Sequence, residues 1–336
     1  MKLKIGVIGC GRLGRVYVQD LSSRIAETRV TAIADTNAAL ARALAREFDV
    51  PRAYADPAEL LADRDVEAVV IVSPTHTHKD LLIAAMAAGK PTFCEKPLAL
   101  SLDECGAMQA AVARHGAFFQ MGFMRRFDKG YRAGKAKLES GAIGTPVVFR
   151  GSSRDPYRPS LEYLAPHNSG GQILDMAIHD IDIARWFMGE VKTVAAVGGV
   201  LAYPEFATVG DLDNAIATLT FADGSLGVVD LTRSGIYGYD ISTELLGTEG
   251  TVRIGYLRET PVLTMTKNCV AHDTVPYFME RFERAYTRQL QNFAQNVVQE
   301  REPPVTIRDG VEALRVALAA TEACRSGRTV TVADVR

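Results

Sequence analysis

Short apolar runs alternate with amphipathic stretches over the first third of the chain. The run from Leu3 to Ile8 is rich in β-branched residues, and a glycine-rich turn and a helical pattern over 12–25 follow it. Further strands are expected at 29–34, 66–72, 91–94 and 117–121, and further helices at 37–48, 79–88 and 101–115. This alternation predicts an α/β domain over residues 1–121, a Rossmann-like doubly wound parallel sheet.

The pattern changes after residue 121. A helix is expected at 131–139, a strand at 146–152 and a glycine-opened helix at 171–188, and hairpin turns then separate several strands. Asp223-Gly224 between two β-rich runs is one strong turn signal. Two amphipathic helices, at 279–298 and 309–325, complete the pattern. We therefore expect an α+β domain with an antiparallel sheet over 122–336, whose last helices can pack back on the first domain.

Length and charge narrow the classes of partner. A chain of 336 residues usually forms more than one core, and its 38 basic and 40 acidic residues give a formal charge of −2. Neither nucleic acid nor a membrane is therefore an expected partner. No uncharged run reaches the roughly 18 residues that a spanning helix needs. The first nine residues lack a signal-peptide pattern, which predicts a cytoplasmic protein.

The five cysteines are scattered and have no zinc-ligand spacing, so we expect reduced thiols and no metal site.

A glycine-rich motif joins the first predicted strand to the first predicted helix. Gly9-Cys10-Gly11-Arg12-Leu13-Gly14 matches G-x-G-x-x-G. In such a motif the first glycine makes the turn, the second lets the backbone approach a pyrophosphate, and the third lets the helix pack closely. The amides at the start of the helix then favour the phosphates. The alternative is a glycine turn that binds no ligand, but the strand and helix on either side favour a dinucleotide.

Asp35 ends the second predicted strand, where an acidic residue accepts hydrogen bonds from the ribose. Its carboxylate would repel a 2'-phosphate, and no arginine follows in Asp35-Thr36-Asn37. The sequence therefore predicts NAD rather than NADP as the cofactor.

Glu95-Lys96-Pro97 lies at the carboxyl end of a predicted parallel strand, the edge at which ligands bind in open α/β sheets. A lysine at that edge can donate a hydrogen bond to a substrate hydroxyl. A solvated surface lysine, or a Lys-Pro pair that starts a helix, is the competing interpretation.

The predicted helix over 171–188 carries a second polar cluster. Spacings of four and seven place Asp175, His179 and Asp182 on one helical face. A histidine beside a carboxylate is a candidate general base. Three alternatives remain open: a buried structural histidine, a simple contact within the helix, and a metal site, of which the metal is least favoured.

These motifs together resemble a known family, the glucose-fructose oxidoreductase and inositol dehydrogenase family. The segments that carry the resemblance are Gly9 to Gly14, Glu95-Lys96-Pro97, Met121 to Asp128, Gly170-Gly171 with Asp175 and His179, and Tyr237-Gly-Tyr-Asp240. They extend over nearly the whole chain, and two of them are most similar to the inositol 2-dehydrogenase branch. The resemblance implies a Rossmann domain, a second domain with a large open, mostly antiparallel sheet, and a homo-oligomer, either a tetramer or a dimer.

The resemblance also implies catalytic roles. Lys96 would contact both nicotinamide and substrate beside a cis Pro97, His179 would take the hydroxyl proton, and Asp175 would be its partner and a substrate ligand. We also expect Ser73 and Glu95 to contact the cofactor.

Three further residues are expected at the substrate. Arg125 and Tyr239 would match polyol-contacting positions, although the motif also offers Tyr237. Ser153 stands where some inositol dehydrogenases carry a histidine, which leaves the identity of the polyol open.

The function expected from the sequence is NAD-dependent oxidation of a cyclic polyol, with myo-inositol giving 2-keto-myo-inositol as the first choice. The alternatives are scyllo-inositol, a pyranose sugar or an aminated derivative as substrate, a regulator that senses NAD without turnover, and a glycosidase that retains its NAD.

Overall fold

The computed structural model describes residues 2–335 and divides into two compact units. The first unit comprises the residues up to Met124 together with Arg284–Leu314. The second comprises Arg125–Glu283 together with the residues from Arg315 onward. No helix within residues 2–335 is both long and apolar enough to cross a membrane.

A six-stranded parallel sheet forms the centre of the first unit. Its order is β3-β2-β1-β4-β5-β6, and all neighbours are parallel. Strands β2 and β3 lie on one side of β1 and strands β4 to β6 on the other, so the strand order reverses between β1 and β4. The strands are β1 (Leu3–Ile8), β2 (Thr28–Ala34), β3 (Arg52–Tyr54), β4 (Ala68–Ile71), β5 (Thr92–Glu95) and β6 (Phe119–Gly122). Strand β4 is buried at every position, as expected of a strand covered by helices on both faces. The predicted doubly wound parallel sheet is confirmed.

Helices connect these strands and are capped by side chains at several starts. They are α1 (Arg12–Gln19), α2 (Ala38–Glu47), α3 (Pro57–Ala62), α4 (His78–Ala87) and α5 (Leu102–His115). Asn37, Asp56 and Ser101 accept hydrogen bonds from first-turn amides of α2, α3 and α5. Gly116 ends α5 in the left-handed conformation. The helices α10 (Phe278–Val298) and α11 (Ile307–Ser326) have residues in both units.

Two elements of the first unit were not expected from the sequence. Strand β3 has only three residues, all half-buried, so no apolar run marks it. The short helix α3 begins with a proline after its capping aspartate. The helix expected over 12–25 also differs, because its α-helical part ends at Gln19 and a π-helical turn, Asp20–Arg24, follows.

The second unit contains a seven-stranded sheet with the order β12-β11-β7-β10-β9-β8-β15. Its strands are β7 (Pro146–Arg154), β8 (Val191–Gly199), β9 (Asn214–Phe221), β10 (Leu226–Thr232), β11 (Asp240–Gly247), β12 (Thr251–Ile254) and β15 (Val330–Thr331). Only β7 and β10 pair in parallel, so the mostly antiparallel sheet is confirmed. The expected turn at Asp223-Gly224 joins β9 to β10.

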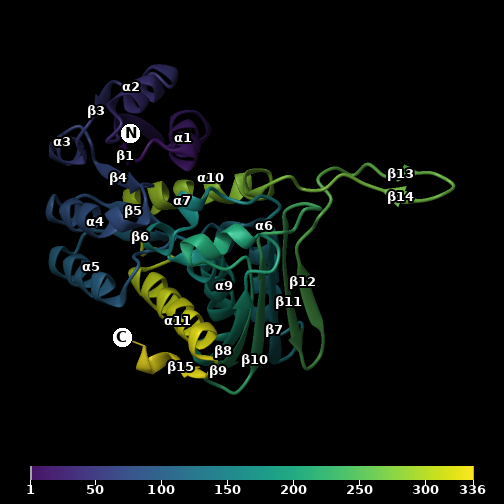
Figure 1. Cartoon of the computed structure of the whole chain (residues 1–336). Helices are drawn as coiled ribbons and strands as arrows, with labels where there is room; N and C mark the ends of the chain where they lie inside the picture. The colour runs from purple at the N-terminus through teal and green to yellow at the C-terminus, as the bar shows by residue number, and fades with distance from the viewer. Residues whose placement is uncertain (1, 336) are drawn as a thin grey trace. The chain divides into compact units, whose positions relative to one another are not determined.

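Helices cover one face of this sheet. The α-helices that lie wholly within the second unit are α6 (Lys129–Glu139), α7 (Leu161–Leu164), α8 (Pro166–Ser169) and α9 (Ile178–Met188). Helix α6 contacts β12, and α9 contacts β7 and β10. Alternate residues of β9 are buried, and the residues between them are exposed or half-buried on the other face. A small hairpin of β13 (Thr264–Met265) and β14 (Val270–Ala271) extends beyond this sheet in Figure 1.

The predicted helix over 171–188 is divided in the structure. Gly170 and Gly171 both have positive φ, at 80° and 81°, and a π-helical turn, Ile173–Ala177, precedes α9. Asp175 lies in the π-helical turn, whereas His179 lies in the first turn of α9. Further short 3-10 segments lie at Thr75–Thr77, Met124–Phe127, Pro204–Val209 and Val332–Asp334.

Candidate functional site

The residues expected to bind the cofactor come together at one edge of the parallel sheet. The glycine loop follows β1, Asp35 follows β2, Ser73 follows β4, and Lys96 follows β5. Because β2, β1, β4 and β5 are parallel neighbours in that order, their carboxyl ends meet at the same edge. Such an edge, where the strand order reverses, is where ligands bind in open α/β folds.

The three glycines of the loop occupy different surroundings. A Cβ on Gly9, whose φ is 105°, would lie 2.7 Å from the carbonyl oxygen of Val72, and a Cβ on Gly14 would lie 2.0 Å from that of Gly9. A Cβ on Gly11 would meet no atom within 4 Å. Helix α1 starts directly after Gly11, an N-cap residue that has no side chain to accept from the first amides. The open space beside Gly11 and the start of the helix fit the pyrophosphate of a dinucleotide.

Backbone amides hold the Asp35 carboxylate in place. Oδ2 accepts a hydrogen bond of 2.8 Å from the amide of Cys10, and Oδ1 accepts one of 2.8 Å from the amide of Asn37. The carboxylate is therefore fixed beside the glycine loop and retains acceptor capacity for a ribose. Burial, with a smaller effect of Asp35, raises the pKa of the Cys10 thiol to about 12, so this cysteine is not a nucleophile at neutral pH.

Glu95, expected at the cofactor, directs its carboxylate into the first unit. Oε1 accepts hydrogen bonds from the Tyr17 hydroxyl and, at 3.3 Å, from the Gln289 amide. Oε2 accepts one of 3.0 Å from the backbone amide of Lys96. Burial raises the pKa of Glu95 above its ordinary value, against the effect of these donors. Glu95 thus ties the start of the Lys96 loop to α1 and α10, and a contact with the cofactor stays a prediction.

His78 joins two of the loops at this edge. Its ring nitrogens lie 2.9 Å from the carbonyl oxygens of Ser73 and Pro97. The Lys96-Pro97 peptide bond is cis, as the resemblance implied. Burial lowers the pKa of His78. Lys96 itself is half-buried and directly follows the end of β5.

In the second unit, both oxygens of the Asp175 carboxylate have a partner. The Tyr163 hydroxyl donates to Oδ1 at 2.9 Å, and the guanidinium of Arg233 donates to Oδ2 at 2.9 Å. Asp175 is buried, whereas His179, four residues later, is half-buried. A fixed carboxylate close in sequence to a partly accessible imidazole can serve proton transfer.

The two other carboxylates of this motif also pair with arginines. Arg125 donates to Asp180 at 2.7 Å, and Arg126 makes a two-pronged contact with Asp182, with a closest distance of 2.6 Å. Asp182 therefore belongs to a different ion pair from Asp175. The expectation that Asp175, His179 and Asp182 share one face holds for a regular α-helix. The π-helical turn Ile173–Ala177 departs from that geometry, so the spacing in sequence does not fix a common face.

The three residues expected at the substrate are buried. Ser153 donates to Asp180 at 2.5 Å and accepts a bond of 3.0 Å from Arg125, so these two lie in one network. Tyr239 packs its ring edge-on against Tyr277 and Phe282. The alternative residue of that motif, Tyr237, is partly exposed and donates to Asp240. Substrate contacts by Arg125, Ser153 and Tyr239 stay predictions.

Several polar partners of the candidate residues in the two units were not identified from the sequence. They are Tyr17, His78, Tyr163, Asp180, Arg233 and Gln289. One signal was available for Arg233, because it continues the inward-facing positions of β10, where Val229 and Leu231 are buried. A charge on the buried face of a strand requires a partner. The other residues carry no comparable local signal.

The arrangement of possible metal ligands bears on the chemistry that the protein can perform. Within residues 2–335, no group of three or more histidine, cysteine, aspartate or glutamate side chains is placed to hold a metal ion.

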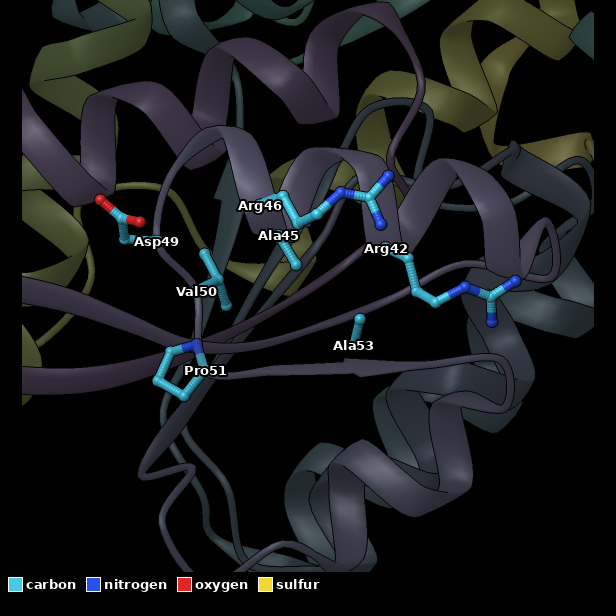
Figure 2. Close-up of a pocket in the computed structure, with 7 residues that line it drawn as sticks. All are labelled: Arg42, Ala45, Arg46, Asp49, Val50, Pro51 and Ala53. Carbon is cyan, nitrogen blue, oxygen red and sulfur yellow. The ribbon is translucent and has the colours of Figure 1, made fainter.

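A surface hollow in the first unit lies at the carboxyl end of α2 (Figure 2), and Asp35 precedes the opposite end of that helix. The hollow is lined by Arg42, Ala45, Arg46, Asp49, Val50, Pro51 and Ala53. It is therefore separate from the dinucleotide edge.

Comparison with known proteins identifies relatives over nearly the full chain. The chain is 39% identical over 335 residues to the myo-inositol 2-dehydrogenase of Thermotoga maritima, covering 99% of both chains. It is 38% identical over 330 residues to the scyllo-inositol 2-dehydrogenase (NAD(+)) of Bacillus subtilis, covering 98% of this chain and 96% of that one. The crystal structure of scyllo-inositol dehydrogenase from Lactobacillus casei with bound NAD(H) and scyllo-inositol superposes with a TM-score of 0.95 at 33% identity, covering 99% and 100%.

Two family models match the chain. The model described as the NAD-binding Rossmann fold of an oxidoreductase family matches residues 3–123, and the C-terminal alpha/beta domain of that family matches residues 135–332. These matches, and the glycine loop with its open space, agree on NAD as the cofactor. The chain belongs to the glucose-fructose oxidoreductase and inositol dehydrogenase family and is an NAD-dependent oxidoreductase.

Proposed function

We propose that this protein oxidises a secondary hydroxyl of a cyclic polyol, with myo-inositol as the substrate and 2-keto-myo-inositol as the product. The observation that carries the proposal is the Asp175 carboxylate, held by Tyr163 and Arg233 four residues before a half-buried His179. A fixed charge and an accessible imidazole are the parts that proton removal from a hydroxyl requires.

The roles of the chain's own residues follow from their chemistry. His179 takes the proton from the reacting hydroxyl, and the negative charge of Asp175 favours the imidazolium that forms. The ammonium group of Lys96 donates a hydrogen bond to the hydroxyl oxygen and stabilises the negative charge that develops there. NAD, when bound, accepts the hydride from the ring carbon. Bringing Lys96 of the first unit and His179 of the second to one substrate is part of the proposal.

The relatives support a cyclic polyol as the substrate class. The similar proteins from Thermotoga maritima and Bacillus subtilis are named for myo-inositol and scyllo-inositol, at 39% and 38% identity. The identities to these two relatives are too similar to decide between the two stereoisomers as substrate, so scyllo-inositol is the second candidate. Asp35, whose carboxylate is fixed beside the glycine loop, supports NAD over NADP, because a 2'-phosphate would meet its charge.

The test is NADH formation by the purified protein with NAD and, in separate arms, myo-inositol, scyllo-inositol, glucose and the pentoses. A high rate with myo-inositol, and 2-keto-myo-inositol identified by NMR, is the expected result. A rate confined to scyllo-inositol or a sugar would replace the substrate but keep the reaction. NAD binding without NADH formation in any arm would overturn the proposal in favour of a regulator or a hydrolase that retains its NAD.

We also propose that the uncovered face of the seven-stranded sheet joins copies of this chain into a tetramer or a dimer. Three neighbouring strands each expose one apolar side chain on that face: Val197 of β8, Ile216 of β9 and Leu226 of β10 are 69%, 47% and 55% exposed. Light scattering should give a multiple of 36.4 kDa for the wild type and a smaller mass for Ile216→Glu. Leu40→Glu, at an exposed leucine of α2, is the control; a wild-type monomer would overturn the proposal.

A further inference from the structure

Arg233 is one of the most deeply buried side chains of the second unit. It is 1% exposed, and it follows the last residue of β10. Its guanidinium donates to Asp175 at 2.9 Å and lies 3.8 Å from a carboxylate oxygen of Asp155. Burial disfavours the charge of Arg233, but the charges of Asp175 and Asp155 outweigh it, so the pKa of Arg233 is raised. The arginine is therefore a permanent cation inside this unit.

The second partner of Asp175 has a different character. Tyr163 stands on the short helix α7, and its side chain is 47% exposed although its hydroxyl binds the buried carboxylate. The charge of Asp175, together with burial, raises the pKa of Tyr163, so the phenol remains a donor at neutral pH. Asp175 is thus held by a buried cation on one oxygen and by a neutral, partly exposed donor on the other.

We infer that Arg233 is a positioning residue for the dehydrogenase reaction, one that keeps Asp175 ionised and correctly oriented beside His179; the inference rests on the proposed function. An aspartate side chain rotates about two bonds, so a carboxylate near the reacting atoms keeps a fixed orientation only if other groups hold it. Arg233 provides that constraint through a charge-assisted hydrogen bond from Nη2 to Oδ2, made by a guanidinium whose donors lie in a rigid plane. It acts through Asp175, and no contact between Arg233 and the substrate is required.

The charge of Arg233 predicts a change in pH dependence that a purely structural role does not. Removing a positive charge favours the protonated form of every acid and base close to it. Arg233→Met should therefore move the acid limb of the kcat/KM profile to higher pH, measured over about pH 6 to 9. At its optimum the variant should lose roughly 100-fold in kcat, the size expected when a catalytic group is displaced by about 1 Å.

Arg233→Lys separates charge from geometry. Lysine keeps the cation but offers no planar fork, so the acid limb should stay near that of the wild type while kcat falls. Tyr163→Phe removes one neutral hydrogen bond and should lower kcat without moving the acid limb. Arg185→Met is the matched control, since Arg185 is also buried and pairs at 2.8 Å with Glu190 beyond the end of α9. It should leave the pH profile unchanged.

A double variant tests whether Arg233 acts through Asp175. If it does, Asp175→Asn with Arg233→Met should be no slower than Asp175→Asn alone, because the partner has already been neutralised. Additive losses would indicate a separate structural effect. Calorimetric binding of myo-inositol to the complex with NADH gives a readout without turnover: binding by Arg233→Met should weaken toward low pH, unlike that of the wild type.

The outcomes distinguish this inference from the proposed function. A wild type that oxidises no cyclic polyol overturns the proposed function and the inference together. An active wild type, with an Arg233→Met profile like that of Arg185→Met and with additive double-variant losses, overturns the inference alone. Urea unfolding of each variant shows whether it is folded. If Arg233→Met does not fold, the comparison of Arg233→Lys with the wild type takes its place.

Discussion

The candidate residues of the two units are held in opposite ways. In the first unit, the residues expected at the cofactor lie in loops that directly follow parallel strands, and backbone groups do much of the positioning: the Asp35 carboxylate is fixed by two amides. In the second unit, Asp175 is fixed by the side chains of Tyr163 and Arg233, 12 and 58 residues away in sequence. A site built from backbone can be identified from a short motif, whereas a site built from distant side chains cannot.

The units also stabilise buried carboxylates differently. Glu95 accepts hydrogen bonds from neutral donors, the Tyr17 phenol, the Gln289 amide and a backbone amide, and burial raises its pKa although these donors and the charge of Lys96 oppose the shift. Asp175, by contrast, faces the guanidinium of a buried arginine. Neutral donors compensate a buried charge only partly, whereas an arginine compensates it directly. The first unit therefore uses its buried carboxylate to join segments, whereas the proposed function requires the ionised carboxylate of the second.

Loss of the imidazole should have the largest effect. His179→Ala should lower kcat by roughly two to four orders of magnitude, the contribution of a general base, while NAD affinity remains close to that of the wild type. His167→Ala, which removes an exposed histidine of α8 in the same unit, is the control. Steady-state kinetics with a fluorescence titration of NAD measure both quantities. Unchanged turnover would show that His179 is not the general base, and the contrast between the candidate residues of the two units would then no longer include proton transfer.

Two glycine substitutions should separate folding from binding within one loop. Gly14→Ala places a Cβ 2.0 Å from a backbone oxygen, and should destabilise the protein by about 1 to 3 kcal/mol or more, as overpacking does. Gly11→Ala meets no protein atom, so its stability should change little, but NAD should bind at least tenfold more weakly because the methyl occupies the space of the pyrophosphate. Urea unfolding and NAD titration measure the two effects. Equal NAD affinity in Gly11→Ala and the wild type would show that the pyrophosphate lies elsewhere.

Local patterns were sufficient for most of the fold. The apolar runs marked five of the six strands of the first sheet, and the Asp223-Gly224 turn marked the β9–β10 hairpin. Strand β3 was missed because its three residues are half-buried and carry no period. The π-helical turn before α9 was missed because the spacing of the polar residues was interpreted with the 3.6 residues per turn of a regular α-helix. Both failures involve departures from regular geometry that tertiary packing stabilises.

The candidate site could be predicted only in part. The sequence identified Asp175 and His179 by type and spacing, but Tyr163 and Arg233 are joined to Asp175 only in the folded unit. It also placed Glu95 at the cofactor, as part of the Glu95-Lys96-Pro97 motif, and that contact stays a prediction. The structure shows that carboxylate bound to Tyr17 and Gln289, 78 and 194 residues away. Side-chain pairs of this separation leave no local trace in a sequence.

A smaller effect is expected at Asp35, the backbone-held carboxylate. Asp35→Asn should weaken NAD binding by about 1.5 to 3 kcal/mol, the range for a hydrogen bond to a charged group, and should narrow the preference for NAD over NADP. Asp56→Asn, at the cap of α3 in the same unit, controls for the loss of one charge. Titration with both nucleotides measures the ratio. A variant as selective as the wild type would show that another residue reads the ribose.

The smallest effect tests the partly compensated charge of the Glu95 carboxylate. Because its pKa is raised in the folded state, the native protein binds more protons than the unfolded chain in the interval above the ordinary value of 4.5. Wild-type stability is therefore lost through this group as pH rises through that interval, and each unit of displacement corresponds to about 1.4 kcal/mol. Glu95→Gln cannot titrate, so its stability relative to the wild type should increase with pH and then level off above the native pKa.

The shape of this difference carries the test, because the amide of Glu95→Gln also meets the Lys96 backbone amide and adds an offset that does not depend on pH. Urea unfolding of both proteins from about pH 4 upward gives the difference curve. Glu104→Gln, at a carboxylate that accepts a bond from the Leu100 amide near the start of α5, is the control for replacing a hydrogen-bonded carboxylate by an amide in the same unit. A flat curve for Glu95→Gln would mean that Tyr17 and Gln289 compensate the charge as fully as an arginine does. The contrast between the two units would then lie in their geometry alone.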